Sequence, residues 1–270
     1  MTYWHTYPEP VPRPPRSISP RPHLDPDPVA WARAALGFSP DPVQARILGA
    51  SDPRLVLCCT RQFGKSTITA IKALHHAWHH PRALVLVAAP TARQSGEWIE
   101  KSSAFLRALG TRPRGDGRNE NSLKLPNGSR LVGLPGVASN IRGFSAVSLL
   151  LIDEAAFVPD DLYQALNPML AVSNGALWLM STPNGQSGFF YEEWHREPSP
   201  WTRFRVTAED CPRISPEFLA GQRIALGDPV YRREYLCEFT AGTTQILTRE
   251  MLDAAFDPTL QPLNQGKPLW

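Results

Sequence analysis

The sequence predicts an α/β fold, in which a mostly parallel sheet is flanked by helices and a small lid subdomain follows. Three observations carry this prediction. Apolar runs typical of buried strands alternate with segments of helical periodicity. The octet Cys59–Ser66 fits the phosphate-binding pattern G-x-x-x-x-G-K-[ST] except at its first position. A later apolar run ends in the acidic pair Asp153-Glu154.

The elements follow one another in a regular order. Residues 1–28 contain nine prolines and read as a Pro-rich disordered arm. A core over 29–185 and a lid over 186–245 come next, and a linker over 246–270 ends the chain. Strands are expected at 55–59, 83–89, 148–152, 176–181 and 203–206, and a hairpin at 123–132 around Asn127-Gly128. Helices are expected at 29–36, 40–48, 66–80, 91–109, 161–170, 216–225 and 230–237.

The strand order narrows the fold class. One strand, at 83–89, lies in sequence between the strand before the phosphate loop and the strand that ends in acids. In addition, Glu154 directly follows Asp153, the residue expected to hold Mg²⁺. Both features favour a RecA-like (ASCE) P-loop NTPase over a kinase or a GTPase.

Composition excludes some classes of protein. Hydrophobic residues make up 42% and charged residues 20%, as in an ordinary globular protein. No apolar run approaches the length of a membrane span, so no membrane partner is expected, and the polar N-terminus is unlike a signal peptide. The four cysteines lack metal-ligand spacing and fit a reduced, cytoplasmic protein. The net charge of +3 is compatible with a polyanionic partner.

The phosphate-loop pattern predicts roles for three residues. Gly64 lets backbone N–H groups close around a phosphate, and Lys65 reaches the outer phosphates. Ser66 offers its hydroxyl to Mg²⁺ at the start of a helix, where the helix dipole favours negative charge. Cys59 stands where the pattern has glycine, so a second site element is needed.

The acidic pair supplies that element. A buried parallel strand would present Asp153 and Glu154 at its C-terminal edge. Asp153 would hold Mg²⁺, and Glu154 would polarise the water that attacks the γ-phosphate of ATP. The alternative is an ordinary core strand with a solvated acidic turn. With the phosphate loop, the pair predicts a Mg²⁺-dependent ATPase.

Three residue groups together resemble the large terminase subunit of tailed bacteriophages. They are Thr60–Thr67 with its Arg-Gln pair, Leu151–Glu154, and Ser181–Gly185. The segment Tyr231–Phe239 is similar to the end of that family's ATPase region. The resemblance covers residues 30–250. It implies an ATP-hydrolysing motor that drives double-stranded DNA into a capsid.

The resemblance and the loop chemistry extend the expected site. Gln44 would contact adenine, with a helix-surface amide as the alternative. Arg61 would act as a cation on the γ-phosphate. Arg142 would reach a neighbouring subunit's ATP, or be a plain surface arginine. Ser181 and Thr182 would sense the γ-phosphate. The nucleotide-contacting set expected is Gln44, Thr60, Arg61, Gln62, Phe63, Gly64, Lys65, Ser66, Thr67, Ser181 and Thr182.

The resemblance also implies partners and a place in the cell. The chain would work as a homo-oligomeric ring on the portal protein, with the small terminase subunit and double-stranded DNA as further partners. It would lie in the bacterial host's cytoplasm and transiently on the procapsid portal. The acidic cluster of the family's nuclease domain has no counterpart, so no nuclease activity is expected from this chain.

Other interpretations remain beside this one. The chain could be a fragment of a superfamily 2 helicase, whose pattern includes Ala89-Pro90-Thr91, or an inactive prophage relic that only binds partners. The histidines at 75, 76, 79 and 80 have i,i+4 metal spacing without a third ligand, which favours a solvated helix end. A basic set near the hairpin could follow a DNA backbone, and it consists of Arg112, Arg114, Arg118, Lys124 and Arg130.

Overall fold

The computed structural model describes residues 25–134, 136, 141, 143–240, 251, 254 and 255. Within this part of the chain, seven strands form one sheet in the order β3-β4-β2-β5-β6-β1-β7. All neighbouring strands are parallel except β3 and β4, which form the expected antiparallel hairpin. The strands are β1 Arg54–Cys59, β2 Leu84–Ala88, β3 Ser122–Lys124, β4 Arg130–Leu134, β5 Leu149–Asp153, β6 Ala176–Ser181 and β7 Thr202–Val206.

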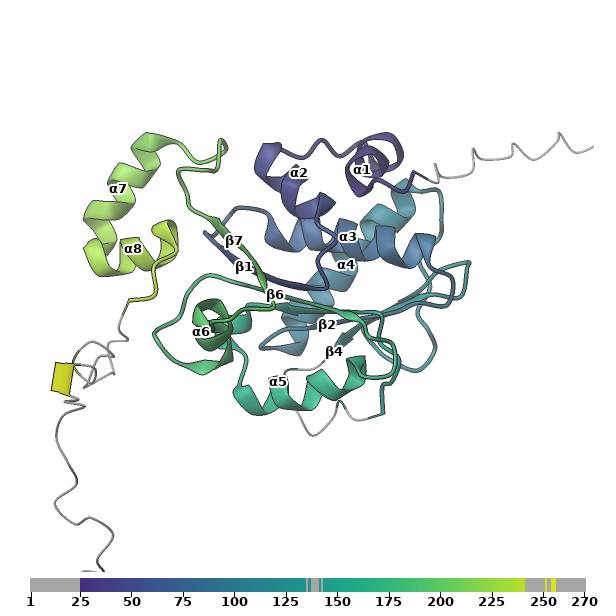
Figure 1. Ribbon diagram of the computed structural model, residues 1–270. Helices are drawn as coiled ribbons and strands as arrows, with labels where there is room; N and C mark the ends of the chain where they lie inside the picture. Colours follow the sequence, from purple (N-terminus) through teal and green to yellow (C-terminus); the bar gives the residue numbers. More distant parts are fainter. Residues whose placement is uncertain are drawn as a thin grey trace, which may run out of the picture.

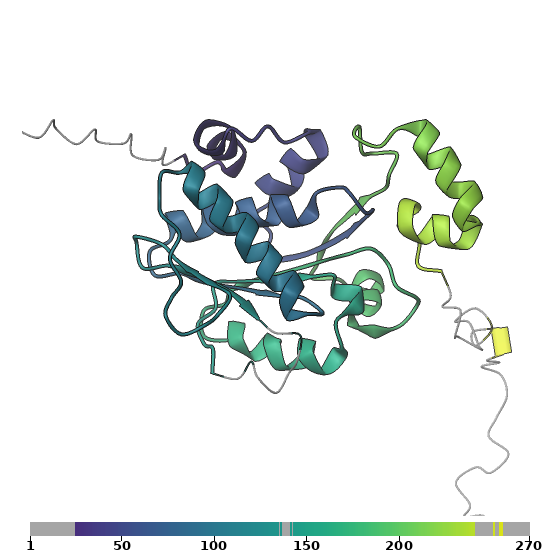
Figure 2. The same ribbon diagram turned by 180° about the vertical axis from the view of Figure 1, so that it is seen from behind.

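Helices cover both faces of the sheet (Figures 1 and 2). One face carries α1 Pro28–Leu36, α2 Pro42–Gly49, α3 Lys65–His79 and α4 Ala92–Ala108. The other face carries the 3₁₀ helix η2 Ala155–Phe157, α5 Asp160–Leu166, η3 Asn167–Leu170 and α6 Gly188–His195. Two further helices, α7 Pro216–Leu226 and α8 Asp228–Leu236, lie beside the edge strand β7.

The interiors of the central strands are apolar because both of their sides are buried. In β1, Leu55, Leu57 and Cys59 pack under α1–α4, whereas Val56 and Cys58 pack under α5 and α6. Alternation along a strand sends neighbouring side chains to opposite faces, so a strand covered twice needs no polar residue. The predicted α/β architecture is confirmed.

Local signals set the helix boundaries. The Asp27 and Asp41 carboxylates cap α1 and α2, and each helix begins with proline. The helix expected over 161–170 is split into α5 and η3. Pro168 has no backbone N–H to continue the α-helical ladder, so the chain tightens to a 3₁₀ turn.

The segment expected as a lid divides between two places. Its strand β7 pairs with β1 and completes the main sheet, and α6 packs on the same face of the sheet as α5. Of its described residues, those of α7 and α8 form a separate small cluster, around Ala208, Leu219 and Tyr231. From here on, "lid" means the segment from Ala208 through α8.

Parallel pairing brings the C-terminal ends of β1, β5 and β6 to one edge of the sheet, where the candidate site lies. Among the helices that the structure describes, none is long and apolar enough to cross a membrane. The predicted Pro-rich arm and C-terminal linker fall almost wholly outside the described residues.

Candidate active site

The phosphate loop joins the end of β1 to the start of α3. Its backbone requires two left-handed conformations, at Gln62 with φ 62° and at Gly64 with φ 90°. A Cβ atom on Gly64 would also stand 3.2 Å from Nε2 of Gln44. Glycine therefore suits position 64 on two grounds, backbone conformation and space.

Ser66 and Asp153 meet across the loop. The Ser66 hydroxyl donates to Oδ2 of Asp153 at 2.9 Å, and the backbone N–H of Glu154 donates to Oδ1 at 3.0 Å. Burial raises the pKa of Asp153 in spite of the nearby Lys65 and these hydrogen bonds. A cation at this position would offset that cost, and oxygen donors are the ligands that Mg²⁺ prefers. The two residues fit a magnesium ion.

Lys65 and Glu154 form the second contact of the site. The Lys65 ammonium lies 2.7 Å from Oε1 of Glu154. Burial lowers the pKa of Lys65, but the surrounding Cys59, Glu154 and Asp153 outweigh it and leave that pKa raised. Glu154 has φ 52°, a conformation that bends the chain sharply after β5 and turns its carboxylate toward the loop.

These groups border a cavity of about 490 Å³. Its lining consists of Arg61, Gln62, Lys65, Pro90, Gln94, Glu154 and Phe157. Sequence reasoning did not select Gln94 and Phe157. Their positions in the chain could have indicated both residues. Gln94 lies just beyond the C-terminal end of β2, and Phe157 lies just beyond the C-terminal end of β5. These ends meet at the same edge of a parallel sheet.

Arg61 and Thr60 connect the loop to the lid. Nε of Arg61 lies 2.7 Å from Oε2 of Glu234 on α8, and the Arg61 side chain is 65% exposed. The Thr60 hydroxyl donates to the backbone carbonyl of Glu234 at 2.9 Å. The predicted action of Arg61 on the γ-phosphate stays a prediction, and the structure shows the arginine paired with a lid carboxylate.

Gln44 lies beneath the loop. Its Nε2 donates to the carbonyl of Phe63 at 3.0 Å, and its Oε1 accepts from the N–H of Asp41 at 3.2 Å. Gln44 is only 5% exposed, so the alternative of a helix-surface amide is wrong. Phe63 itself belongs to the core. The adenine contact proposed for Gln44 stays a prediction.

The remaining expected residues divide into three groups. Ser181 and Thr182 are buried at the end of β6, between β5 and β1, and the Ser181 hydroxyl has no hydrogen-bond partner within the described residues. Thr67 lies in the first turn of α3, and its N–H donates to the carbonyl of Gly64. Arg142 falls outside the described residues.

The structure offers no second metal centre in the part that it describes. No group of three or more His, Cys, Asp or Glu side chains there could hold a metal ion. The histidine rings of α3 contact each other in pairs instead: His76 and His80 are stacked, and His75 and His79 are tilted with their centroids 4.1 Å apart. Their i,i+4 spacing reflects ring packing. His75 is buried, so the solvated helix end expected here is wrong for that residue.

Comparisons with known proteins bear on the family and the fold. The chain is 26% identical over 248 residues to the terminase large subunit of Thermus phage G20c, covering 79% of this chain and 51% of that protein. The Thermus phage P74-26 large terminase ATPase domain superposes with a TM-score of 0.65 at 25% identity, over 77% of this chain and 97% of the domain.

A second solved structure shares the fold at lower identity. It is the large terminase of another thermophilic bacteriophage, in complex with ATP-γ-S, with a TM-score of 0.60 and 16% identity, over 82% of this chain and 53% of that one. The chain spans about half the length of the curated relatives it matches. These matches do not favour the helicase-fragment alternative.

A family model decides the assignment. The model described as terminase large subunit, T4likevirus-type, N-terminal, matches residues 57–254. That range runs from within β1 to beyond the lid and includes the phosphate loop and the acidic pair. The chain belongs to the terminase large-subunit family, in its N-terminal part.

Proposed function

We propose that this chain is the ATP-hydrolysing motor portion of a phage terminase large subunit, which drives double-stranded DNA into the capsid. One observation carries the proposal. Lys65 and Ser66 at the start of α3 directly contact Glu154 and Asp153 at the end of β5, at 2.7 and 2.9 Å. Lys65 and Glu154, a phosphate-binding cation and a candidate base, therefore line one cavity, and the candidate metal-binding pair Ser66 and Asp153 lies beside them.

Each residue has a role that its position supports. Lys65 binds the outer phosphates of ATP, and Ser66 with Asp153 would hold Mg²⁺, which would neutralise phosphate charge. Glu154 accepts a proton from the attacking water. In the structure Glu154 is paired with Lys65, so phosphates that bind Lys65 would free the Glu154 carboxylate for this task.

Four further residues would stabilise charge or sense the γ-phosphate in this proposal. Arg61 can exchange Glu234 for the γ-phosphate, because its side chain is long and largely exposed. The unpartnered Ser181 hydroxyl, with Thr182 beside it, is suited to sense the γ-phosphate from the strand between β5 and β1. Arg142 is proposed to reach the ATP of the next subunit in a ring.

Double-stranded DNA is the proposed polymer, and a basic loop supports it. Arg112, Arg114 and Lys124 line a cavity of about 710 Å³ beside β3, and none of the three forms an ion pair within the described residues. Unpaired cations gain most from phosphate contacts. The remaining partners proposed are the portal protein, the small terminase subunit and further copies of this chain, in the host cytoplasm and on the procapsid portal.

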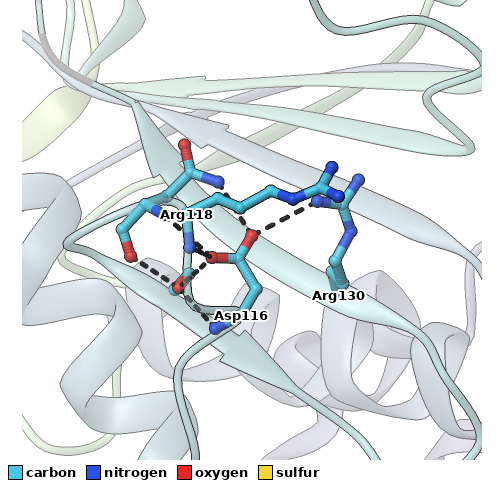
Figure 3. Close-up of polar contacts among 5 residues, drawn as sticks. Asp116, Arg118 and Arg130 are labelled. Carbon is cyan, nitrogen blue, oxygen red and sulfur yellow. Dashed lines mark hydrogen bonds and ion pairs between the residues drawn. The ribbon is translucent and has the colours of Figure 1, made fainter.

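Asp116 holds the basic loop in shape (Figure 3). Its carboxylate accepts hydrogen bonds from the backbone N–H groups of Arg118 and Asn119 and from the Ser122 hydroxyl, and it pairs with Arg130 at 3.3 Å. Burial raises the pKa of Asp116, but these hydrogen bonds outweigh it and hold the pKa well below its usual value. The loop charges consequently project from a fixed backbone.

The function is tested by ATP hydrolysis. The wild-type chain should release phosphate from ATP in a Mg²⁺-dependent reaction, and Lys65→Ala should lower the rate by about a hundredfold or more. Lys101→Ala, an exposed lysine of α4, is the matched control and should keep the wild-type rate. Hydrolysis by Lys65→Ala at the wild-type rate would contradict the proposal, as would a wild-type chain that only binds partners.

A further inference from the structure

Two buried thiols meet where the end of the lid packs on the sheet. Cys58 is the penultimate residue of β1, and Cys237 is the residue that caps the C-terminal end of α8. Both are buried in the apolar cluster that α5 and α6 cover. They lie 179 positions apart in the chain, so only the packing of the lid end against β1 brings these thiols together.

The contacts of the two thiols are direct. Sγ of Cys58 donates to the carbonyl of Cys237 at 3.9 Å, and the two side chains are also hydrogen-bonded to each other. Sγ of Cys237 donates to the carbonyl of Val206, the last residue of β7, at 3.2 Å. The same carbonyl accepts from the backbone N–H of Thr60 at 2.9 Å. The thiol pair therefore lies at the base of the phosphate loop.

The other two cysteines are placed differently. Alternation along β1 sends the side chain of Cys59 to the face of the sheet opposite Cys58. Cys211 packs in the same cluster as Cys59, under the helices of that opposite face. Of the four cysteines, Cys58 and Cys237 are thus the two that share the cluster beside the end of α8.

We propose that Cys58 and Cys237 are a redox modification site, which a small disulfide such as oxidised glutathione converts into a disulfide that fixes the end of the lid to β1. One cysteine thiolate attacks a sulfur of the reagent, which forms a mixed disulfide and releases one small thiol. The second cysteine then attacks the protein sulfur of that mixed disulfide and releases the other small thiol. The cysteine pair loses two electrons and two protons, and the reagent becomes two thiols.

Motion of the lid controls access to this site. The hydrogen bond with Cys237 and burial raise the pKa of Cys58, so its thiol stays protonated and unreactive while the lid end is in place. The lid has a small apolar cluster of its own, so it can move away from β1 as a unit. Cys237 moves with α8 and reacts first. Return of the lid then brings Cys58 to the mixed disulfide.

The disulfide would restrain the contacts beside the phosphate loop. Glu234, on the last turn of α8, pairs with Arg61 and accepts a hydrogen bond from Thr60 through its backbone carbonyl. A covalent bond from Cys237 to β1 keeps Glu234 next to Arg61. Since the proposed function requires Arg61 to exchange Glu234 for the γ-phosphate, oxidation should slow ATP hydrolysis, and this consequence rests on the proposed function.

Peptide mapping by mass spectrometry tests the site. The full chain is incubated with oxidised glutathione, free thiols are blocked with iodoacetamide, and the chain is digested without reduction. We expect a linked peptide pair that contains Cys58 and Cys237 and lacks two hydrogens, and we expect dithiothreitol to separate it. Phosphate release from ATP, measured on the same samples, should be mostly lost on oxidation and regained on reduction.

Three variants make the assignment specific. Cys237→Ser keeps a donor for the Val206 carbonyl, and it should form no linked pair and keep its ATPase activity in oxidised glutathione. Cys58→Ala removes the other thiol and gives an independent check, should either variant fold poorly. Cys211→Ser removes a buried thiol outside the pair and is the matched control, so it should form the linked pair as the wild type does.

Two results would overturn the inference. The folded wild type could yield no linked pair of Cys58 and Cys237, or the pair could form without slowing an otherwise active ATPase. The peptide map does not depend on ATP, so it judges the thiol pair by itself. A reduced wild-type chain that hydrolyses no ATP would contradict the proposed function, whereas absence of the linked pair in an active chain would contradict only the redox site.

Discussion

Lys65 is the residue at which the two halves of the site meet. Its backbone begins α3, and its ammonium pairs with Glu154, which follows β5. Phosphates of ATP that bind this ammonium would compete with the Glu154 carboxylate for it. In the proposed mechanism, this competition would couple phosphate binding to activation of the water.

The partners of individual side chains were predictable where local patterns determine them. The sequence predicted that four side chains would meet, because parallel strands end at one edge of a sheet. They are Lys65, Ser66, Asp153 and Glu154. The pairing of Arg61 with Glu234 could not be predicted, since the two lie 173 positions apart and meet only through the packing of the lid. The burial of Gln44 escaped prediction because its partner, the Phe63 carbonyl, carries no sequence signal.

At the scale of elements, α3 spans the molecule from the phosphate loop to the opposite edge of the sheet. Its N-terminus holds Lys65 and Ser66, and its C-terminal turns hold the paired histidines. Nε2 of His75 donates to the carbonyl of Asp25 at 3.2 Å, and Nε2 of His76 shares a hydrogen bond with the Ser148 hydroxyl at 3.0 Å. The helix is thus fixed at both ends by polar contacts.

The histidines of α3 predict a pH-dependent stability. Burial and the neighbouring cationic groups lower the pKa values of His75 and His76 from 6.5 to about 4. Between pH 6.5 and pH 4, these two histidines bind protons in the unfolded chain but stay neutral in the folded chain. The free energy of unfolding therefore falls as the pH drops from 6.5 to 4. At pH 5 each histidine should account for about 1–2 kcal/mol of lost unfolding free energy.

Urea unfolding at several pH values measures this effect. His76→Gln keeps a side chain able to hydrogen-bond Ser148 but cannot titrate, so its stability should fall less between pH 7 and pH 5 than that of the wild type. His195→Gln, at an exposed position that ends α6, is the control. An identical loss of stability in wild type and His76→Gln would refute the assignment.

Helices and strands could be predicted from the sequence where the residues that determine them lie close together in the chain. The buried strands, the Asn127-Gly128 hairpin and the capped helices follow from periodicity and turn residues. The place of β7 does not, because its pairing with β1 joins segments far apart in sequence. For this reason the range expected as a separate lid contributes a strand to the main sheet.

At the scale of the whole molecule, the basic loop borders β3 at one end of the sheet, with four strands between β3 and β1, which leads into the phosphate loop. The cavity of Lys65 and Glu154 is lined by segments that follow β1, β2 and β5, so it lies nearer the middle of the sheet. A motor of this form would hydrolyse ATP and hold its polymer at two separate places. Motion of the lid or of neighbouring subunits would have to connect the two.

The DNA-binding prediction belongs to this scale. Arg114→Ala/Lys124→Ala should bind duplex DNA more weakly than the wild type and with a salt dependence reduced by about two phosphate contacts. Arg33→Ala/Lys101→Ala removes two exposed charges on α1 and α4 and should bind as the wild type does. Fluorescence anisotropy over a salt series makes the measurement. Equal salt slopes in all three proteins would show that the basic loop is not part of the DNA-binding surface.

The central claim is that this chain hydrolyses ATP with Glu154 as the group that activates water. The most direct measurement is phosphate release by Glu154→Ala beside a calorimetric titration of the same variant with ATP. Because Glu154 acts on the water, we expect the rate to fall by about a hundredfold or more while ATP binding persists. Hydrolysis by Glu154→Ala at the wild-type rate would contradict the account.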